Sequence, residues 1–148
     1  MTLSTLAAAL LAAVLSLFGL RPAPEVAEAI ATATREHGCD APLVAAVCVK
    51  ESQLGTIRVR HLLCGAHLRV AGDGPRAWDR SAGAQVGAAC RAFPRRASRA
   101  SWARGLAAWR CGAGPRDAAC RATVGARYAG AVLDMRDRIA ASMRAARP

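Results

Sequence analysis

The chain has 148 residues and a formal net charge of +11, and 53% of its residues are hydrophobic but only 4% aromatic. This length predicts one compact domain. The composition excludes a wholly disordered chain, a collagen, a coiled coil and a polytopic membrane protein. Lys50 is the single lysine among 21 basic residues, and the arginines are dispersed. Dispersed charge is typical of solvated helix faces, so no nucleic acid partner is expected, whereas an anionic polymer suits the charge.

The first predicted element is the segment from residue 3 to residue 20, which is almost entirely apolar and carries no charge. Its length is typical of the hydrophobic part of a signal peptide or of a short membrane anchor. We therefore expect residues 1–23 to direct export, to the periplasm or the medium, and either to be cleaved or to hold the protein at a membrane. No basic residue precedes the segment, and the alternative is an N-terminal core helix.

The expected domain, residues 24–148, begins with a predicted helix over residues 24–37, which has a proline in its first turn and a glycine after its end. Asp40 then has the side chain and the position of an N-cap for a second helix that ends near Leu54. The next stretch, residues 55–74, contains several glycines and predicts a loop.

Helices are also predicted over residues 81–93, 98–109 and 117–145, with a Gly/Pro break at residues 112–115. Two sets of apolar side chains recur at helical spacing and should be buried: Trp102, Leu106 and Trp109 in one helix, and Val124, Tyr128, Val132, Met135, Ile139 and Met143 in the last. The sequence therefore predicts a mainly α domain of about five or six helices, which we expect to be a monomer.

All six cysteines follow the apolar segment. An even number behind an export-like segment predicts three disulfides in an oxidising compartment. Zinc is the competing interpretation, but the chain lacks a Cys-x-x-Cys pair. The connectivity stays open, with Cys111–Cys120 the first choice because a Gly/Pro loop joins them. Cys39–Cys48 is disfavoured because one helix separates the two residues. The candidates are Cys39, Cys48, Cys64, Cys90, Cys111 and Cys120.

Glu51 is the acidic residue whose position is most unusual. It follows Val44, Val47 and Cys48 by seven, four and three residues, which places its carboxyl on the apolar face of the second helix. Apolar surroundings disfavour the carboxylate anion and so favour the protonated form that a general acid needs. The alternative is a structural glutamate paired with an arginine at the helix end.

The wider pattern resembles the lysozyme-like lytic transglycosylases. Residues 43–52 form an apolar stretch that ends in Glu-Ser, as in that family's signature. Residues 64–66 resemble the start of its second motif, and residues 106–114 its third, usually Ala-Tyr-Asn-Ala-Gly. Tyr128 stands where the family's last helix opens with Tyr-Val. The four motifs occur in the family's order and cover about residues 24–140.

The resemblance implies a lysozyme-like helical fold and cleavage of the peptidoglycan bond between MurNAc and GlcNAc, with formation of 1,6-anhydro-MurNAc. It implies that Glu51 is the catalytic acid and base, and that the partner is the glycan strand. Neither a metal nor a cofactor is expected. The substrate-binding residues that it implies are Ser52, Trp109, Arg110 and Tyr128.

The chain departs from the family pattern at two places. Residues 67–70 read His-Leu-Arg-Val where the family has a Gly-Leu-Met-Gln motif, and Arg110 replaces the asparagine of the third motif. Two alternatives therefore stay open beside the lyase. One is a hydrolytic muramidase assisted by Asp73 or Asp79, and the other is a catalytically impaired protein that binds cell-wall glycan or a partner.

Overall fold

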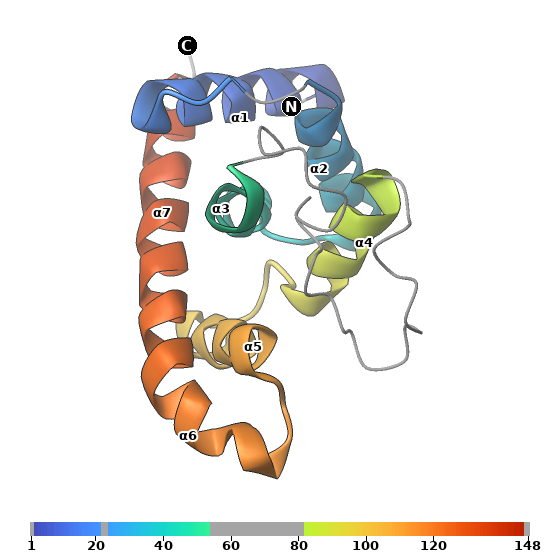
Figure 1. Ribbon diagram of the computed structural model, residues 1–148. Coiled ribbons are helices and arrows are strands. Elements are labelled where there is room, and N and C mark those ends of the chain that lie inside the picture. The colour runs from blue at the N-terminus through green and yellow to red at the C-terminus, as the bar shows by residue number, and fades with distance from the viewer. Residues whose placement is uncertain (1, 22–23, 54–81, 147–148) are drawn as a thin grey trace.

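The computed structural model describes residues 2–21, 24–53 and 82–146 (Figure 1). It is 84% helical and contains no strand within these ranges, which confirms the predicted mainly α class. The long helices are α1 (Leu3–Phe18), α2 (Pro24–His37), α3 (Ala41–Ser52), α4 (Ala82–Ala92), α5 (Arg99–Cys111) and α7 (Ala126–Ala145), with the short α6 (Ala118–Cys120) before the last.

The helices begin and end close to the predicted residues because the predicted capping groups are in place. The Asp40 carboxylate accepts a hydrogen bond of 2.9 Å from the backbone N–H of Leu43 and so caps α3. The helix ends at Ser52, followed by Gln53 in the left-handed conformation. Gly38 takes the same conformation after α2, where a side chain would strain the backbone. The predicted loop at residues 55–74 lies outside the described residues.

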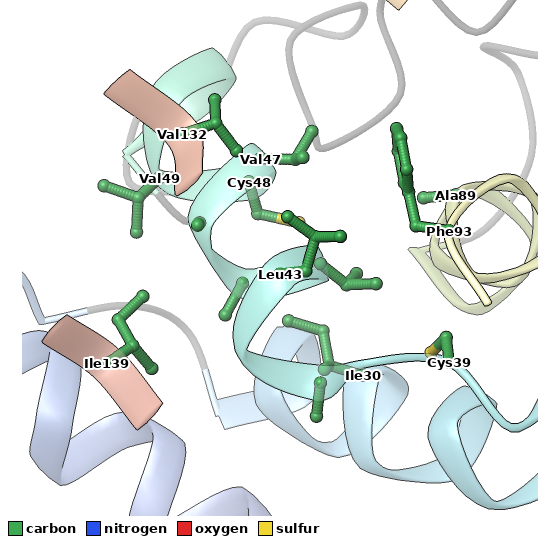
Figure 2. Packing of buried hydrophobic residues seen from close by; sticks show 14 of the residues in the cluster. Ile30, Cys39, Leu43, Val47, Cys48, Val49, Ala89, Phe93, Val132 and Ile139 are labelled. Atoms are coloured by element: carbon green, nitrogen blue, oxygen red, sulfur yellow. The ribbon is translucent and has the colours of Figure 1, made fainter. Parts of the chain in front are cut away.

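The core is built around α3, which lies between α2, α4 and α7 (Figure 1). Every side chain from Leu43 to Val49 is buried, as expected for a helix that is covered on all faces. Figure 2 shows the packing around this helix. Its partners in the core cluster include Ile30 of α2, Phe93 after α4 and Val132 of α7.

Helix α1 packs across α2 and α7 (Figure 1). Leu10 and Val14 are completely buried in the same core cluster as α3, and Phe18 lies beneath the guanidinium of Arg138. This packing agrees with the alternative of an N-terminal core helix. Across the described parts of the chain, no helix combines the length and the apolar character needed to cross a bilayer. The assignment of residues 1–23 to export stays a prediction.

One residue of the predicted apolar stripe was predicted to be buried but is exposed in the structure. Val124 is 46% exposed, whereas the other stripe residues are buried or packed against the core. The reason is a π-helical turn at Arg121–Gly125, which widens the helix and breaks the 3.6-residue period on which the prediction depended. At this level Gly125 faces α5, and a Cβ there would lie 3.0 Å from the Ala107 carbonyl oxygen.

Two disulfides join described cysteines. Cys111–Cys120 confirms the first choice, with Cα atoms 5.8 Å apart. Cys39 pairs with Cys90, with Cα atoms 5.0 Å apart, so the disfavoured Cys39–Cys48 pairing does not occur. Cys48 is disulfide-bonded as well, and Cys64 lies outside the described residues. The Cys39–Cys90 bond ties the connection between α2 and α3 to α4, and the Cys111–Cys120 bond ties the end of α5 to the helical segment that leads into α7.

Candidate active site

Glu51 lies in the last turn of α3, half-buried and facing α7. The Oη of Tyr128 donates a hydrogen bond of 2.6 Å to Glu51 Oε1, although 77 residues separate the two in sequence. Because α3 and α7 pack side by side, the last turn of one helix meets the first turns of the other. The structure thus brings together the two residues that the motifs had singled out.

Tyr128 is held as a proton donor by its surroundings. Burial raises the pKa of its phenol well above the usual value, the hydrogen bond to Glu51 and the charge of Glu51 raise it further, and the charge of Arg110 lowers it. Because an ionised phenol beside a carboxylate would be two buried like charges, the neutral phenol is favoured. The hydroxyl therefore directs one hydrogen bond onto Glu51 over the whole neutral pH range.

Arg110 completes this cluster from α5. Its guanidinium carbon lies 6.0 Å from the centre of the Tyr128 ring, within the range of a cation–π contact. The side chain is exposed. Tyr128 thus contacts the cation of Arg110 through the face of its ring and the carboxyl group of Glu51 through its hydroxyl. We call Glu51, Tyr128 and Arg110 the open cluster.

The two other predicted site residues, Ser52 and Trp109, make their observed contacts with core residues. Ser52 is fully buried, and its hydroxyl donates to the carbonyl oxygen of Cys48 at 3.1 Å. The ring of Trp109 packs 5.4 Å from that of Phe93, and its indole N–H is buried without an acceptor in the described part of the chain. In this structure both side chains therefore support the core, and their substrate-binding role stays a prediction.

The opposite end of α3 carries a second charged cluster, made of Asp40, Arg136 and Trp102. Arg136 of α7 donates to the two carboxylate oxygens of Asp40, at 3.1 and 2.7 Å, and its guanidinium lies 5.1 Å from the Trp102 ring. The hydrogen bond to Asp40 raises the pKa of Arg136, burial lowers it, and Asp137 raises it again. We call this group the closed cluster, because its carboxylate and its cation bind each other directly.

Sequence reasoning did not find the closed cluster. It assigned Asp40 only a capping role, because nothing in the sequence connects this residue with Arg136, 96 residues later. The arginine-paired carboxylate that was the alternative for Glu51 is realised at Asp40 instead. Within the described residues, no ion pair joins Glu51 to an arginine, and its hydrogen-bond partner is the phenol of Tyr128.

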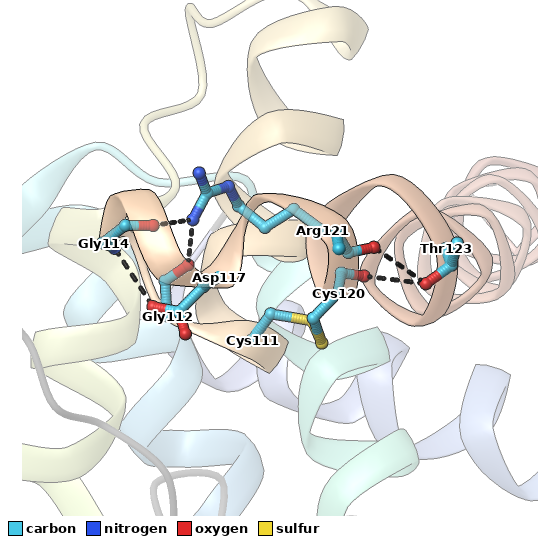
Figure 3. Close-up of a disulfide and its surroundings, with 8 residues drawn as sticks. Cys111, Gly112, Gly114, Asp117, Cys120, Arg121 and Thr123 are labelled. Atoms are coloured by element: carbon cyan, nitrogen blue, oxygen red, sulfur yellow. Dashed lines mark hydrogen bonds between the residues drawn. A yellow bond between two sulfur atoms is a disulfide. The ribbon is translucent and has the colours of Figure 1, made fainter.

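The connection between α5 and α7 is braced by a disulfide and by hydrogen bonds (Figure 3). Cys111 directly follows Arg110, and its disulfide to Cys120 joins the two helical segments that carry Arg110 and Tyr128. Arg121 adds hydrogen bonds of 2.8 and 2.7 Å to the carbonyl oxygens of Gly112 and Gly114. This bracing limits the relative movement of the guanidinium and the phenol.

The π-helical turn at Arg121–Gly125 comes directly before α7 and three residues before Tyr128. Such turns are frequent at functional sites, because they change the direction in which the following side chains point. Here the turn coincides with the close contact of Gly125 with Ala107, so it helps to set the position of α7 against α5. The apolar periodicity of the sequence gave no sign of it.

Several sequence-derived candidates cannot be placed. The second motif at residues 64–70 and the two acids Asp73 and Asp79 lie outside the described residues. Over the ranges that are described, no three His, Cys, Asp or Glu side chains gather as metal ligands would. The arrangement that can be examined is therefore one carboxyl group, one neutral phenol and one exposed guanidinium.

The chain was compared with family models, curated proteins and solved structures. No family model, no curated protein and no solved structure matches this chain.

Proposed function

We propose that this protein is a peptidoglycan lytic transglycosylase with a lysozyme-like fold, in which Glu51 is the catalytic acid and base. The observation that carries the proposal is the hydrogen bond of 2.6 Å from Tyr128 to Glu51. The motif resemblance selects these same two residues independently of any geometry. A carboxyl group at the end of a core helix, held by a neutral phenol, has the properties that a proton-transferring group requires.

The first step is protonation of the leaving group. Glu51 in its acid form gives its proton to the glycosidic oxygen between MurNAc and GlcNAc, and the bond from that oxygen to C1 of MurNAc breaks. C1 then carries positive charge in an oxocarbenium-like state. The Glu51 carboxylate that remains is stabilised by the phenol of Tyr128, whose hydrogen bond to an anion is stronger than one to a neutral acid.

The second step closes a ring within the sugar. The Glu51 carboxylate takes the proton of the C6 hydroxyl of the same MurNAc, and O6 forms a bond to C1. The product is 1,6-anhydro-MurNAc, and Glu51 regains its proton for the next cycle. The nucleophile belongs to the substrate, so the reaction consumes no water and requires one carboxyl group rather than two.

Three of the described aspartates are held in ion pairs with arginines, which supports a reaction that uses the carboxyl group of Glu51 alone. Asp40 is bound by Arg136, and Asp134 and Asp137 are bound by Arg99. A substrate outside the cytoplasm fits the expected export of the chain, to the periplasm or the medium, and the disulfides are stable in an oxidising compartment. We propose that the protein acts there as a monomer, without a metal or a cofactor.

Digestion of purified peptidoglycan by the disulfide-bonded protein tests this proposal. Mass spectrometry should find fragments that end in 1,6-anhydro-MurNAc, and fragments with reducing ends would indicate a hydrolytic muramidase instead. Glu51→Gln should abolish the release of fragments while leaving the fold and glycan binding intact. Glu28→Gln is the matched control, because Glu28 is exposed on α2, and it should cleave like the wild type. Binding without any release by the wild type would overturn the enzymatic proposal.

A further inference from the structure

The exposed guanidinium of Arg110 is the group in the open cluster that the proposed proton transfers do not use. It makes no hydrogen bond and no ion pair with another residue in the described ranges, and its contact is the face of the Tyr128 ring. Two other arginines of the same helices are already bound to acids. Arg136 holds Asp40, and Arg99 holds Asp134 and Asp137. Arg110 therefore keeps its N–H donors available to a ligand.

A contact orients this cation although its donors are unused. The guanidinium lies over the face of the Tyr128 ring, and the hydroxyl of the same ring binds Glu51. The disulfide that begins at Cys111, the next residue, anchors the end of α5. A cation–π contact uses the flat face of the guanidinium and leaves its N–H edges directed outward. A ligand that reaches Glu51 thus meets a preorganised set of cationic donors one aromatic ring away.

We propose that Arg110 binds a carboxylate carried by the muramic acid residue of the glycan. This inference rests on the proposed function and adds to it the substrate group that is selected. A carboxylate matches the two parallel N–H groups of a guanidinium, and charge-assisted hydrogen bonds are roughly twice as strong as neutral ones. A sugar hydroxyl would leave the positive charge without a counter-ion.

Two sources supply such a carboxylate in peptidoglycan. In strands stripped of peptide, the lactyl group of MurNAc ends in a free carboxylate. In intact strands the lactyl group is linked to peptide through an amide, and the carboxylates belong to the peptide. The proposed contact is the same in both cases, so substrates that differ in this group can identify the source.

The test measures kcat and KM on three substrates: intact strands, strands stripped of peptide, and strands whose carboxyl groups have been converted to amides. On the strands with the recognised carboxylate, Arg110→Gln should raise KM roughly 10- to 100-fold with little change in kcat. Arg110→Lys should recover part of the loss, because it keeps the charge but not the paired donors. On the amidated strands the wild type and Arg110→Gln should behave alike.

Arg138→Gln is the matched control, because Arg138 is also an exposed arginine above an aromatic ring, that of Phe18. It lies ten residues beyond Tyr128 on α7 and should change neither constant. Equal losses for Arg110→Gln on all three substrates, or no loss on any, would contradict carboxylate recognition. A melting curve for each variant separates these results from misfolding.

A binding measurement keeps this inference separate from the proposed chemistry. Glu51→Gln protein and the double variant Glu51→Gln/Arg110→Gln are titrated with the same three strands. We expect the double variant to bind strands with the recognised carboxylate roughly 10- to 100-fold more weakly and amidated strands equally well. If the wild type cleaves nothing, the proposed function fails, while this titration still decides whether Arg110 recognises a carboxylate. Equal binding by both proteins to all strands would overturn the inference.

Discussion

The two ends of α3 carry the same kinds of group in different arrangements. At its start, Asp40 meets Arg136 of α7 and Trp102 of α5, and the cation binds the carboxylate directly. At its end, Glu51 meets Tyr128 of α7, with Arg110 of α5 beyond the ring. In both clusters an arginine lies above an aromatic ring. Only in the closed cluster does that arginine also bind the carboxylate.

This difference agrees with a structural role for the closed cluster and with the proposed catalytic role for the open cluster. Two guanidinium N–H groups of Arg136 bind the Asp40 carboxylate, whereas one neutral phenol binds the carboxyl group of Glu51. The closed cluster joins α3 to α7 by an ion pair, and under the proposed function the open cluster offers its carboxyl group and its cation to the substrate.

The largest expected effect on stability comes from breaking the closed cluster. Asp40→Ala removes the cap of α3 and leaves Arg136 without its main partner, which should lower the free energy of unfolding by about 3 kcal/mol. Asp40→Asn keeps a capping oxygen and should cost less. Urea unfolding followed by circular dichroism measures both, with Glu28→Ala at an exposed position of α2 as control. An Asp40→Ala loss no larger than the control would show that this pair does not fix α3.

The corresponding change in the open cluster should act on rate rather than on stability. Tyr128→Phe keeps the buried ring and removes the hydroxyl that holds Glu51, and we expect kcat to fall about 100-fold while the melting temperature changes little. Glycan release under saturating substrate measures it. If Tyr128→Phe destabilised the fold as much as Asp40→Ala and left kcat unchanged, the two clusters would have exchanged the roles assigned to them.

A smaller effect is expected from the π-helical turn that leads to Tyr128. In Gly125→Ala the added Cβ would lie 3.0 Å from the Ala107 carbonyl oxygen, and this backbone contact forces α5 and α7 apart. The free energy of unfolding should fall by about 2 kcal/mol, with a loss of activity. Gly130→Ala is the control, because a Cβ there meets nothing within 4 Å. Equal stability of the two variants would contradict the close packing at Gly125.

The smallest effect is a shift in the titration of Tyr128, the single tyrosine of the chain. Burial, the hydrogen bond to Glu51 and its charge raise the pKa of this phenol, so the native protein should ionise above the ordinary value of about 10. The absorbance of tyrosinate measures this, with urea-unfolded protein as reference. Because the folded state favours the protonated phenol, this contribution to stability is complete below about pH 10 and declines at higher pH.

The variant Glu51→Gln tests how much of the raised pKa of Tyr128 is due to Glu51. Without the charge of Glu51, Tyr128 should ionise at a lower pH than in the wild type, yet still above the unfolded reference, because burial is the larger cause. Coincident native and unfolded curves would mean that the phenol is not held as described.

Local chemistry explains which parts of the fold and the site could be predicted. Caps such as Asp40 and Ser98 act within three residues of their own position, so the sequence predicts the helix ends well. The π-helical turn depends on the contact of Gly125 with a different helix, which no periodicity contains. For the same reason Val124 was placed on the wrong face.

In the site, too, local features could be predicted from the sequence and tertiary contacts could not. The spacing within α3 put Glu51 on its apolar side, and the motif order selected Tyr128, but only tertiary structure shows the bond between them. The pairing of Asp40 with Arg136 joins residues 96 positions apart and has no local signal. Trp109 was an ambiguous choice from sequence, because an aromatic at helical spacing suits both the core and a sugar platform.

The most direct test of the central proposal is a digestion of peptidoglycan in water labelled with a heavy isotope of oxygen. Mass spectrometry then measures the masses of the products. If Glu51 transfers the C6 hydroxyl proton and O6 attacks C1, the new ends are anhydro sugars that are lighter by one water and carry no label. New reducing ends that carry the heavy oxygen would show that water is the nucleophile and would contradict the non-hydrolytic mechanism.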